Sequence, residues 1–327
     1  MDTRFGLIAD VGGTNARFAL APIKDEFHSI LEEELVHIRT LSAIKFPNFE
    51  EAIKDYLSSI PSVYSRPKQG TIAIACPTDT DLIRMTNNNW AFSQSELQAN
   101  LEFSSLTFIN DFFAVACAVP YLTDKQIIQI GEGHPIDYLP KVVTGPGTGL
   151  GLGAVIFDTK GHPVTVQGEG GHIHFAPVDD TERYLLEFLL KKYPRVSVER
   201  LVSGQGLENI YEGLQYKYYH KTITMDANDI SKRALAGDDE VCVESLNYFC
   251  AIFGSFCGDA ALMYGAKGGV YIGGGIIPKI LDFLKTSEFR QRFIDKARLS
   301  PFVLKVPTFV IVSKQPGLLG AAAYLNR

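Results

Sequence analysis

The sequence predicts an α/β protein made of two related halves. Short apolar strands alternate with amphipathic helices, and a strand–glycine turn–strand pattern occurs twice, at residues 5–20 and at residues 141–157. A pattern that recurs in the same arrangement is typical of a duplicated structural unit. The 327 residues are also enough for about two domains. We therefore expect two α/β domains, each built around one glycine-rich hairpin.

The composition argues against a nucleic-acid partner and for a reducing compartment. Apolar residues make up 46% and charged residues 21% of the chain, which is ordinary for a globular protein. The net charge of −6 leaves no excess of basic side chains to neutralise nucleic-acid phosphates. The five cysteines form no C-x-x-C pair, and their number is odd. We expect a cytoplasmic protein that binds small molecules.

No membrane segment is expected from the sequence. Residues 1–10 lack the long apolar stretch of a secretory signal. The most apolar helix candidate, residues 241–264, carries Glu244, Asn247 and Asp259. Three such polar side chains indicate the core helix of a domain rather than a membrane span.

The first glycine turn follows a buried strand that ends at Asp10. Gly12 and Gly13 remove side chains from the turn and allow a ligand to approach the backbone amides. Thr14 adds a hydroxyl group and Asn15 an amide. A carboxylate, bare amides and a hydroxyl together suit a magnesium-bound polyphosphate. Taken alone, an ordinary hairpin whose Asp10 caps its own turn explains the stretch equally well.

Two further glycine clusters also follow strands. Gly145–Gly151 lies between two strands, and Gly273–Gly275 lies between a strand and a helix. A bare backbone at a helix start can contact a base or a phosphate, although a tight strand-to-helix turn explains the last cluster as well. No G-x-x-x-x-G-K-[ST] is present, which argues against a P-loop. Gly149-x-Gly151-x-x-Ala154 matches the loose dinucleotide pattern, but a strand follows it instead of the required helix.

Asn110 and Asp111 lie between a short strand at residues 106–109 and an apolar helix at residues 112–119. In open α/β sheets, ligands bind beyond the carboxyl ends of the strands, where these two residues fall. Either residue is also a good helix N-cap. The two roles are compatible, because a cap and a catalytic group can be neighbouring residues.

The middle of the chain offers three more polar candidates. Glu169 and His172 lie among glycines, where a neutral ligand can pack against the chain and meet two polar side chains. A zinc site at Glu169, His172 and His174 is a weaker alternative, because a further ligand is missing and no cysteine is nearby. Glu199 lies in a stretch, residues 197–200, that we expect to open a helix. There its charge could simply complement the helix dipole.

Local patterns predict several other elements. Residues 48–51 and 93–96 match helix N-cap signals. Residues 30–38 are expected to form a strand, and Gly254–Gly258 to mark close packing of a buried helix. Residues 316–323 are expected to form a helix of small residues that packs back on the first domain, with proline in its first turn.

The motifs taken together resemble those of one family. They occur in the order Ile8–Arg17, Asn110-Asp111, Gly145–Gly151, Glu169–His172, Val198–Arg200, Gly273–Gly275 and Pro316–Gly320. This set closely resembles bacterial glucokinases of the hexokinase, actin and heat-shock ATPase superfamily, over essentially the whole chain. D-x-G-G-T-N alone would mark only the superfamily, whereas the joint set is far more specific.

The resemblance implies two ribonuclease-H-like (actin-like ATPase) α/β domains flanking a deep cleft. The smaller domain would take residues 1–121 plus 313–327, and the larger, with extra helices, residues 122–312. The implied activity is the first step of glycolysis, in which ATP phosphorylates D-glucose at the 6-hydroxyl to give glucose 6-phosphate and ADP. The resemblance also implies ATP and Mg²⁺ as cofactors and a homodimer as the assembly.

The resemblance assigns roles to residues of this chain. Asp111 matches the family's catalytic base. The positions that match its hexose contacts are Asn110, Asp111, Glu169, His172 and Glu199. The positions that match its nucleotide site are Asp10, Gly12, Gly13, Thr14, Asn15, Gly147, Thr148, Gly149, Gly273, Gly274 and Gly275. Asp10 would also hold Mg²⁺, directly or through water.

Two alternatives stay open at this point. A nucleotide switch or filament protein of the same superfamily needs the glycine hairpins but not Glu169, His172 and Glu199. A kinase for mannose, fructose or an amino sugar would share all of these residues. The chain lacks the Cys-rich zinc motif of a related branch and an N-terminal DNA-binding helix pair, which argues against a sugar-responsive repressor.

Overall fold

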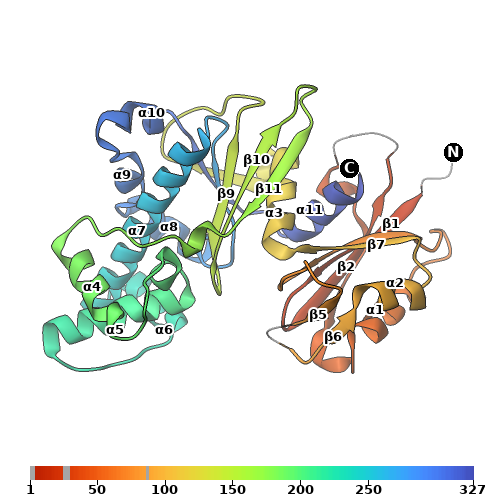
Figure 1. Ribbon diagram of the computed structural model, residues 1–327, viewed down its shortest axis with the longest axis horizontal. Coiled ribbons are helices and arrows are strands. Elements are labelled where there is room, and N and C mark those ends of the chain that lie inside the picture. The colour runs from red at the N-terminus through yellow and green to blue at the C-terminus, as the bar shows by residue number, and fades with distance from the viewer. Residues whose placement is uncertain (1–3, 25–29, 86–87) are drawn as a thin grey trace. The chain divides into compact units, whose positions relative to one another are not determined.

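Each glycine-rich hairpin lies within a β-sheet, and the chain forms two α/β units around these sheets (Figure 1). The computed structural model describes residues 4–24, 30–85 and 88–327. The first three residues of the stretch inspected for a secretory signal lie outside these ranges. One unit comprises Met1–Asp124 with Ser313–Arg327, and the other comprises Lys125–Val312.

The sheet of the first unit has five strands in the order β3-β2-β1-β4-β7. The first three strands are antiparallel, and β4 and β7 run parallel to β1. The strands are β1 (Phe5–Val11), β2 (Asn15–Pro22), β3 (Val36–Ser42), β4 (Gln69–Ile74) and β7 (Ser105–Asn110). A separate two-stranded sheet joins β5 (Leu82–Arg84) and β6 (Ala91–Ser93).

Strand β1 is apolar on both faces because helices cover both faces of its sheet. Leu7 and Ala9 pack in one cluster with side chains of α1 (Phe49–Ser58) and α2 (Gln94–Asn100). Ile8, which points to the opposite face, packs with α11 (Pro316–Leu325) and with the end of α3 (Asp111–Ala118). The continuous apolar run of β1 therefore reflects burial on two sides.

The second unit repeats this strand order. Its sheet runs β11-β10-β9-β12-β13-β8. Strands β9, β10 and β11 form an antiparallel meander, and β12 and β13 continue parallel to β9. The strands are β8 (Ile127–Ile130), β9 (Lys141–Pro146), β10 (Leu150–Phe157), β11 (Pro163–Gly168), β12 (Val270–Ile272) and β13 (Thr308–Ile311). Apart from the added strand β8, the order and directions match those of the first sheet, which confirms the predicted duplication.

A helical layer packs on this second sheet around α7 (Glu240–Tyr264). The other helices are α4 (Asp180–Leu190), α5 (Gly204–Tyr219), α6 (Ala227–Ala236), α8 (Leu281–Thr286), α9 (Phe289–Ile294) and α10 (Ser300–Leu304). A Cβ on Gly254 would collide with the carbonyl oxygen of Phe289, and one on Gly258 with that of Phe293. The two glycines therefore let α7 approach the backbone of α9, as predicted.

Helix α7 is the one described helix long and apolar enough to cross a membrane by length and composition. Inside the unit, however, 72% of its most apolar window is buried. Phe249, Phe253 and Phe256 lie in the same cluster as the apolar residues of β9 and β12. The prediction of a core helix is confirmed.

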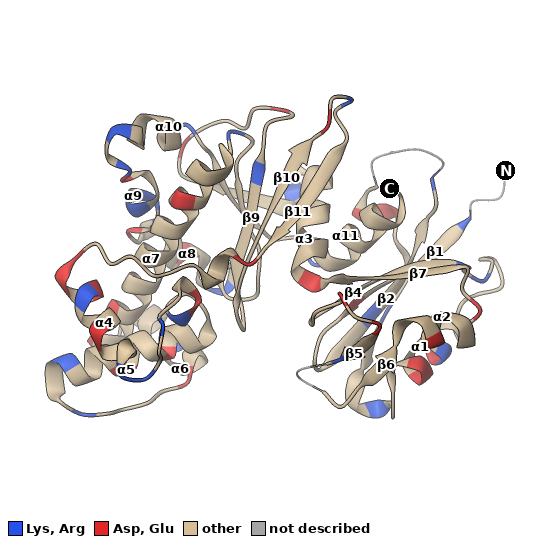
Figure 2. Cartoon of the chain, in the orientation of Figure 1, with Lys and Arg blue, Asp and Glu red and all other residues tan. Residues whose placement is uncertain are grey.

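Helix starts follow the predicted capping signals. The Asn48 side chain accepts a hydrogen bond from the Glu51 amide at 2.9 Å, and Ser93 accepts one from the Glu96 amide at 3.1 Å. Acidic residues also occupy the first turns of helices such as α1 and α4 (Figure 2). Their charge complements the positive end of the helix dipole.

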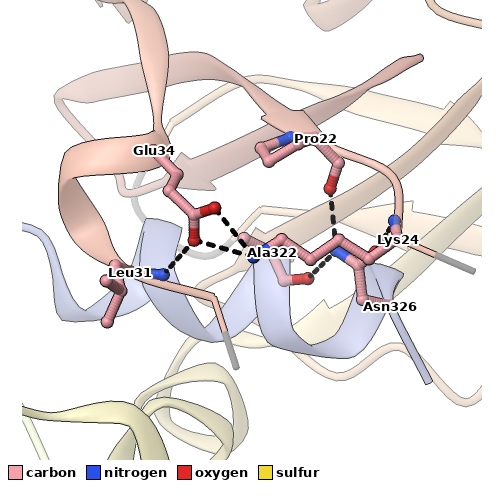
Figure 3. Close-up of polar contacts among 6 residues, drawn as sticks. All are labelled: Pro22, Lys24, Leu31, Glu34, Ala322 and Asn326. Atoms are coloured by element: carbon pink, nitrogen blue, oxygen red, sulfur yellow. Dashed lines mark hydrogen bonds and ion pairs between the residues drawn. The ribbon is translucent and has the colours of Figure 1, made fainter. Parts of the chain in front are cut away.

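The expected strand at residues 30–38 is wrong in its position. A 3₁₀ helix occupies Glu32–Glu34, and pairing with β2 begins only at Val36. The Glu34 carboxylate accepts a hydrogen bond from the Leu31 amide at 2.7 Å and pairs with the Lys24 ammonium (Figure 3). The contact with Leu31 closes a turn, because the Glu34 side chain binds the backbone three residues before it in the chain.

The C-terminal helix α11 packs within the first unit, as predicted. In Figure 1 it lies beside α3, and a Cβ on Gly320 would collide with the carbonyl oxygen of Ala114. Its end is fixed by Asn326, whose side chain is buried (Figure 3). Asn326 Oδ1 accepts a hydrogen bond from the Lys24 amide at 2.7 Å, and Nδ2 donates to the carbonyl oxygens of Pro22 and Ala322.

Replacing Asn326 by alanine is expected to destabilise the first unit by about 1–3 kcal/mol, because the buried carbonyl group of Pro22 and the half-buried amide of Lys24 lose their partner. Urea unfolding followed by the fluorescence of Trp90 measures this, since the chain's only tryptophan is buried in the first unit. Asn326→Asp should lose at least as much stability as alanine, because its buried carboxylate would face the carbonyl oxygens of Pro22 and Ala322. Equal unfolding midpoints for wild type and Asn326→Ala would contradict the expectation.

Candidate functional site

Asp10 lies near the end of β1, beside the first glycine turn. The Gly12 amide donates to the Asn15 carbonyl oxygen at 2.9 Å and closes this turn. A Cβ on Gly317, in the first turn of α11, would lie 2.7 Å from the Asp10 carboxyl carbon. The helix therefore meets the carboxylate at a position where only glycine fits.

The pKa of Asp10 is raised to about 6. Burial is the main cause and the negative charge of Asp111 the second, and the positive charge of Arg17 partly opposes both.

This raised pKa has a consequence for stability. The unfolded chain ionises Asp10 near its ordinary pKa of 3.8, whereas the folded unit holds the proton up to about pH 6. Stability is therefore lost as the pH rises between these values. Asp10→Asn, which stays neutral, is expected to unfold at higher urea than wild type at pH 7.5. The expected gain in the free energy of unfolding is roughly 1–2 kcal/mol. It is smaller than the full pKa shift implies, because the Asp10 side chain is only partly buried and solvent screens its charge.

Urea unfolding monitored by Trp90 fluorescence, without metal or nucleotide, measures this difference across a pH series. The gain of Asp10→Asn over wild type should shrink toward zero as the pH falls to 4. A variant less stable than wild type at pH 7.5 would show instead that neighbours such as the N-terminus of α11 stabilise the charge.

Asn110 and Asp111 lie at the same edge of the sheet as Asp10. Strands β1, β4 and β7 are parallel, so their carboxyl ends meet there, with Asn110 paired to Ile74 and Asp10 to Ala73. Asn110 is the N-cap of α3, and its side chain accepts hydrogen bonds from the amides of the next turn. Asp111 is the first residue of the helix. The cap and the neighbouring carboxylate are thus separate groups at one helix start.

Asp111 is held in place by the helix that it begins. Its Oδ1 accepts a hydrogen bond from the Phe112 amide at 2.8 Å. Burial raises the pKa of Asp111, and hydrogen bonds from Phe112, from its own amide and from Asn110 partly oppose the rise. Burial, together with the negative charge of Asp111, also raises the pKa of the Cys76 thiol to about 11. The site in this unit is a partly buried carboxylate pair with a neutral thiol beside it.

The second and third glycine clusters lie together in the second unit. The Gly273 amide donates to the Thr144 carbonyl oxygen at 2.8 Å, and a Cβ on Gly145 would collide with the Gly273 carbonyl oxygen. Gly274 has a φ of +85°, which disfavours any other residue. Among the residues that the structure describes, and leaving out the chain neighbours of each glycine, no atom lies within 4 Å of the Cβ position of Gly147 or of Gly275. One sheet edge thus carries two bare turns with open space before them.

Glu199 lies directly against the Gly147–Leu150 turn. Its Oε2 accepts a hydrogen bond from the Leu150 amide at 2.9 Å, and its Oε1 lies 3.9 Å from His172 Nδ1. Residues 197–200 were expected to open a helix, and they do form a helical turn, although a short one. Glu199 lies in a single 3₁₀ turn, Val198–Arg200, and α5 begins only at Gly204, where the Ser203 side chain caps it by accepting from the Gly206 amide.

The two glycines between Glu169 and His172 pack tightly on β10. A Cβ on Gly170 would collide with the Leu152 side chain, and one on Gly171 with the Leu150 carbonyl oxygen. Glu169 and His172 themselves are exposed. Within residues 4–24, 30–85 and 88–327, no three His, Cys, Asp or Glu side chains are grouped so as to hold a metal ion. His174 instead meets the Arg195 guanidinium, with its Nε2 3.1 Å from Arg195 Nε.

Comparison with known proteins places this geometry in a family. The sequence profile of the family described as Glucokinase matches residues 7–327. The chain belongs to the glucokinase family. A curated glucokinase of Colwellia psychrerythraea is 44% identical over 98% of this chain and 96% of its own length. One of Salmonella heidelberg is 42% identical over 99% of this chain and 98% of its own length.

Solved structures of glucokinases share the fold of this family member. The crystal structure of a glucokinase from an Antarctic psychrotroph matches with a TM-score of 0.88 at 36% identity and covers 99% of both chains. A ROK-family glucokinase from Streptomyces griseus, solved with glucose and AMPPNP, matches with a TM-score of 0.58 at 18% identity over 98% of both chains. Together with the repeated strand order, these matches confirm the predicted actin-like ATPase fold class.

Two contacts of the site in this glucokinase-family chain are not predictable from its sequence: the one between Gly317 and Asp10 and the one between Leu150 and Glu199. Gly317 lies in a stretch that carried the family resemblance, but nothing in its sequence indicates that Asp10 lies against it. The hydrogen bond from the Leu150 amide to Glu199 joins segments that are far apart in the chain. The glycines themselves were the signal available in the sequence, because a Cβ at Gly149 or Gly317 would lie within 3 Å of the carboxylate of Glu199 or Asp10.

Proposed function

We propose that this chain transfers the γ-phosphoryl group of ATP to the 6-hydroxyl of D-glucose, giving glucose 6-phosphate and ADP as the first step of glycolysis. ATP-dependent phosphorylation of glucose is the activity of the family to which the chain belongs. The observation that carries the mechanism is the Asp111 carboxylate, fixed in the first turn of α3 beside the capping Asn110.

Asp111 is proposed as the general base. Its carboxylate accepts the proton of the 6-hydroxyl while that oxygen attacks the γ-phosphorus, and the bridging oxygen leaves with ADP. Burial raises the pKa of Asp111 and so strengthens it as a proton acceptor at neutral pH. The Phe112 amide holds Oδ1 and so fixes the orientation of the carboxylate.

Asn110, Glu169, His172 and Glu199 are proposed to bind the sugar together with Asp111. A sugar carries several hydroxyls, and each one left unpaired in a site costs binding free energy. In the second unit, His172 Nδ1 and Glu199 Oε1 lie close together, so that one hydroxyl can bridge them. The exposure of Glu169 and His172 leaves both accessible to a ligand.

The nucleotide is proposed to bind at Asp10, Gly12, Gly13, Thr14 and Asn15 in the first unit and at Gly147, Thr148, Gly149 and Gly273–Gly275 in the second. A bound Mg²⁺ would neutralise charge on the phosphates. Asp10 suits it, held directly or through water, because the carboxylate lies beside a bare turn and no described residue donates a hydrogen bond to it. Asp10 would thus bind and orient the metal–nucleotide pair.

The test is a coupled assay of ADP release with ATP and Mg²⁺ across a panel of glucose, mannose, fructose and glucosamine. Glucose should be turned over with the highest kcat/KM, and glucose 6-phosphate should be the product. A protein inert toward the whole panel would overturn the proposal. A nucleotide switch or filament protein would hydrolyse ATP without saturable glucose binding in calorimetry, and a different preferred hexose would correct the substrate.

Further parts of the proposal concern the domains, the location and the assembly. We assign residues 1–121 plus 313–327 to the smaller domain and 122–312 to the larger. A cytoplasmic location agrees with the five free cysteines, all buried. A homodimer is proposed from the family resemblance, and sedimentation analysis would test it.

A further inference from the structure

The Glu199 carboxylate touches two different parts of the proposed site in the second unit. Its Oε2 accepts the Leu150 amide at 2.9 Å, and it lies only 2.5 Å from the Cβ position of Gly149. Its Oε1 lies 3.9 Å from His172 Nδ1. One carboxylate thus contacts the glycine turn assigned to ATP with one oxygen and the imidazole assigned to the sugar with the other.

The backbone around Glu199 is tied to the same turn. The Ser203 hydroxyl donates to the Glu199 carbonyl oxygen at 2.9 Å, and the Gly204 amide donates to the Gly147 carbonyl oxygen at 2.9 Å. The Gly147 amide in turn donates to the Gly149 carbonyl oxygen at 2.8 Å. Residues 199–204 and the Gly147–Leu150 turn are therefore joined at two points, and a shift of one displaces the other.

We propose that Glu199 couples the sugar site to the nucleotide turn, and that Gly149 is a positioning residue for sugar recognition. The absence of a side chain at Gly149 is what lets the carboxylate reach the Leu150 amide. This amide fixes Oε2, so that Oε1 is presented beside His172. The inference rests on the proposed function, since it takes the roles of the sugar residues and of the turn from there.

Two crossed effects follow from this coupling. A side chain at Gly149 should weaken sugar binding even without nucleotide, because it displaces the Glu199 carboxylate. Removal of the carboxylate should weaken nucleotide binding even without sugar, because the Leu150 amide loses the partner that orders the turn. By thermodynamic linkage, sugar and nucleotide should each raise the affinity for the other by the same factor.

The first experiment is calorimetric titration of glucose into wild type, Gly149→Ala and Gly147→Ala without nucleotide. The two variants add the same methyl group to the same turn, but apart from its chain neighbours no described residue has an atom within 4 Å of the Gly147 Cβ position. Gly149→Ala should bind glucose about 10-fold more weakly or worse, and Gly147→Ala within about twofold of wild type. Equal glucose affinities for the two variants would overturn the inference.

The second experiment measures AMPPNP affinity without sugar in Glu199→Ala and Glu199→Gln, and it stands if Gly149→Ala fails to fold. Glu199→Ala should bind AMPPNP several-fold more weakly, and Glu199→Gln, whose amide oxygen still accepts from Leu150, should recover most of the loss. Unchanged AMPPNP affinity in Glu199→Ala would show that the carboxylate serves the sugar alone. Failure of wild type to bind glucose would refute the proposed function itself, whereas normal wild-type binding with unaffected variants would refute only the coupling.

Discussion

Replacement of Asp111 by alanine is expected to lower kcat by roughly 10²–10⁴-fold while saturable glucose binding survives. The carboxylate is the proposed acceptor of the 6-hydroxyl proton, and the attacking oxygen must lose this proton as the phosphorus–oxygen bond forms. The other proposed sugar contacts are untouched by the change. The coupled ADP assay gives kcat, and calorimetric titration gives the glucose affinity.

Helix α4 offers a matched control for this variant. Asp180 occupies the first position of α4, as Asp111 does in α3, and its side chain is exposed. Asp180→Ala should leave kcat unchanged, which separates the loss of a catalytic carboxylate from the loss of an acidic helix start. Asp111→Asn, which keeps an acceptor for the Phe112 amide, should be nearly as inactive as alanine.

Two outcomes would contradict the assignment of the base. Near-normal kcat in Asp111→Ala would remove Asp111 from the chemistry. Weaker glucose binding in both Asp111 variants, with kcat unchanged at saturating glucose, would make Asp111 a sugar contact only. Circular dichroism of each variant shows whether α3 and its unit remain folded.

Much of the fold was predictable because local signals and the duplication agree. The hairpins around Gly12 and Gly147, the cap at Asn48 and the close packing at Gly254 each follow from a short stretch of sequence. The expected strand at residues 30–38 was wrong because side-chain contacts of Glu34 decide the local structure: its carboxylate accepts the Leu31 amide and pairs with Lys24, which favours a turn. Apolar alternation within a short stretch does not record such a partner.

The candidate site was predictable in its residue types but less so in its contacts. Asn110 and Asp111 follow a strand, and strand ends are where ligands bind in α/β sheets. Glu199, in contrast, looked like an ordinary acidic residue of a first helical turn. Its hydrogen bond with Leu150 depends on how β10 and the segment before α5 meet, and that arrangement belongs to the tertiary structure alone.

The largest effect on stability is expected for Glu182→Ala, at about 3–5 kcal/mol out of a total that is typically 5–15 kcal/mol. Glu182 is fully buried and lies 2.7 Å from the Arg292 guanidinium, which is itself largely buried. Its other oxygen accepts the Val178 amide at 2.8 Å, and Arg292 Nε donates to Ser255 at 3.0 Å. The pair ties α4, α7 and α9 together, and removal of the carboxylate leaves a buried cation without its partner.

Urea unfolding followed by far-UV circular dichroism measures this loss, because the helices concerned carry much of the signal. The exposed Asp180–Arg183 pair of the same helix is the control, and Asp180→Ala should leave the unfolding midpoint nearly unchanged. A Glu182→Ala midpoint close to that of wild type would show that water or a rearranged side chain satisfies Arg292.

A double replacement separates the value of the pair from the cost of breaking it. Burial raises the pKa of Glu182 despite its bonds to Val178 and Arg292, so desolvation of the carboxylate outweighs the attraction of its partners. Glu182→Leu with Arg292→Met should therefore be more stable than either single variant, because no buried charge remains unpaired. A double variant that loses the sum of the two single losses would contradict this, because it would show that the two charges do not interact. A double variant that is also less stable than wild type would show that the pair contributes net stability over its apolar replacement.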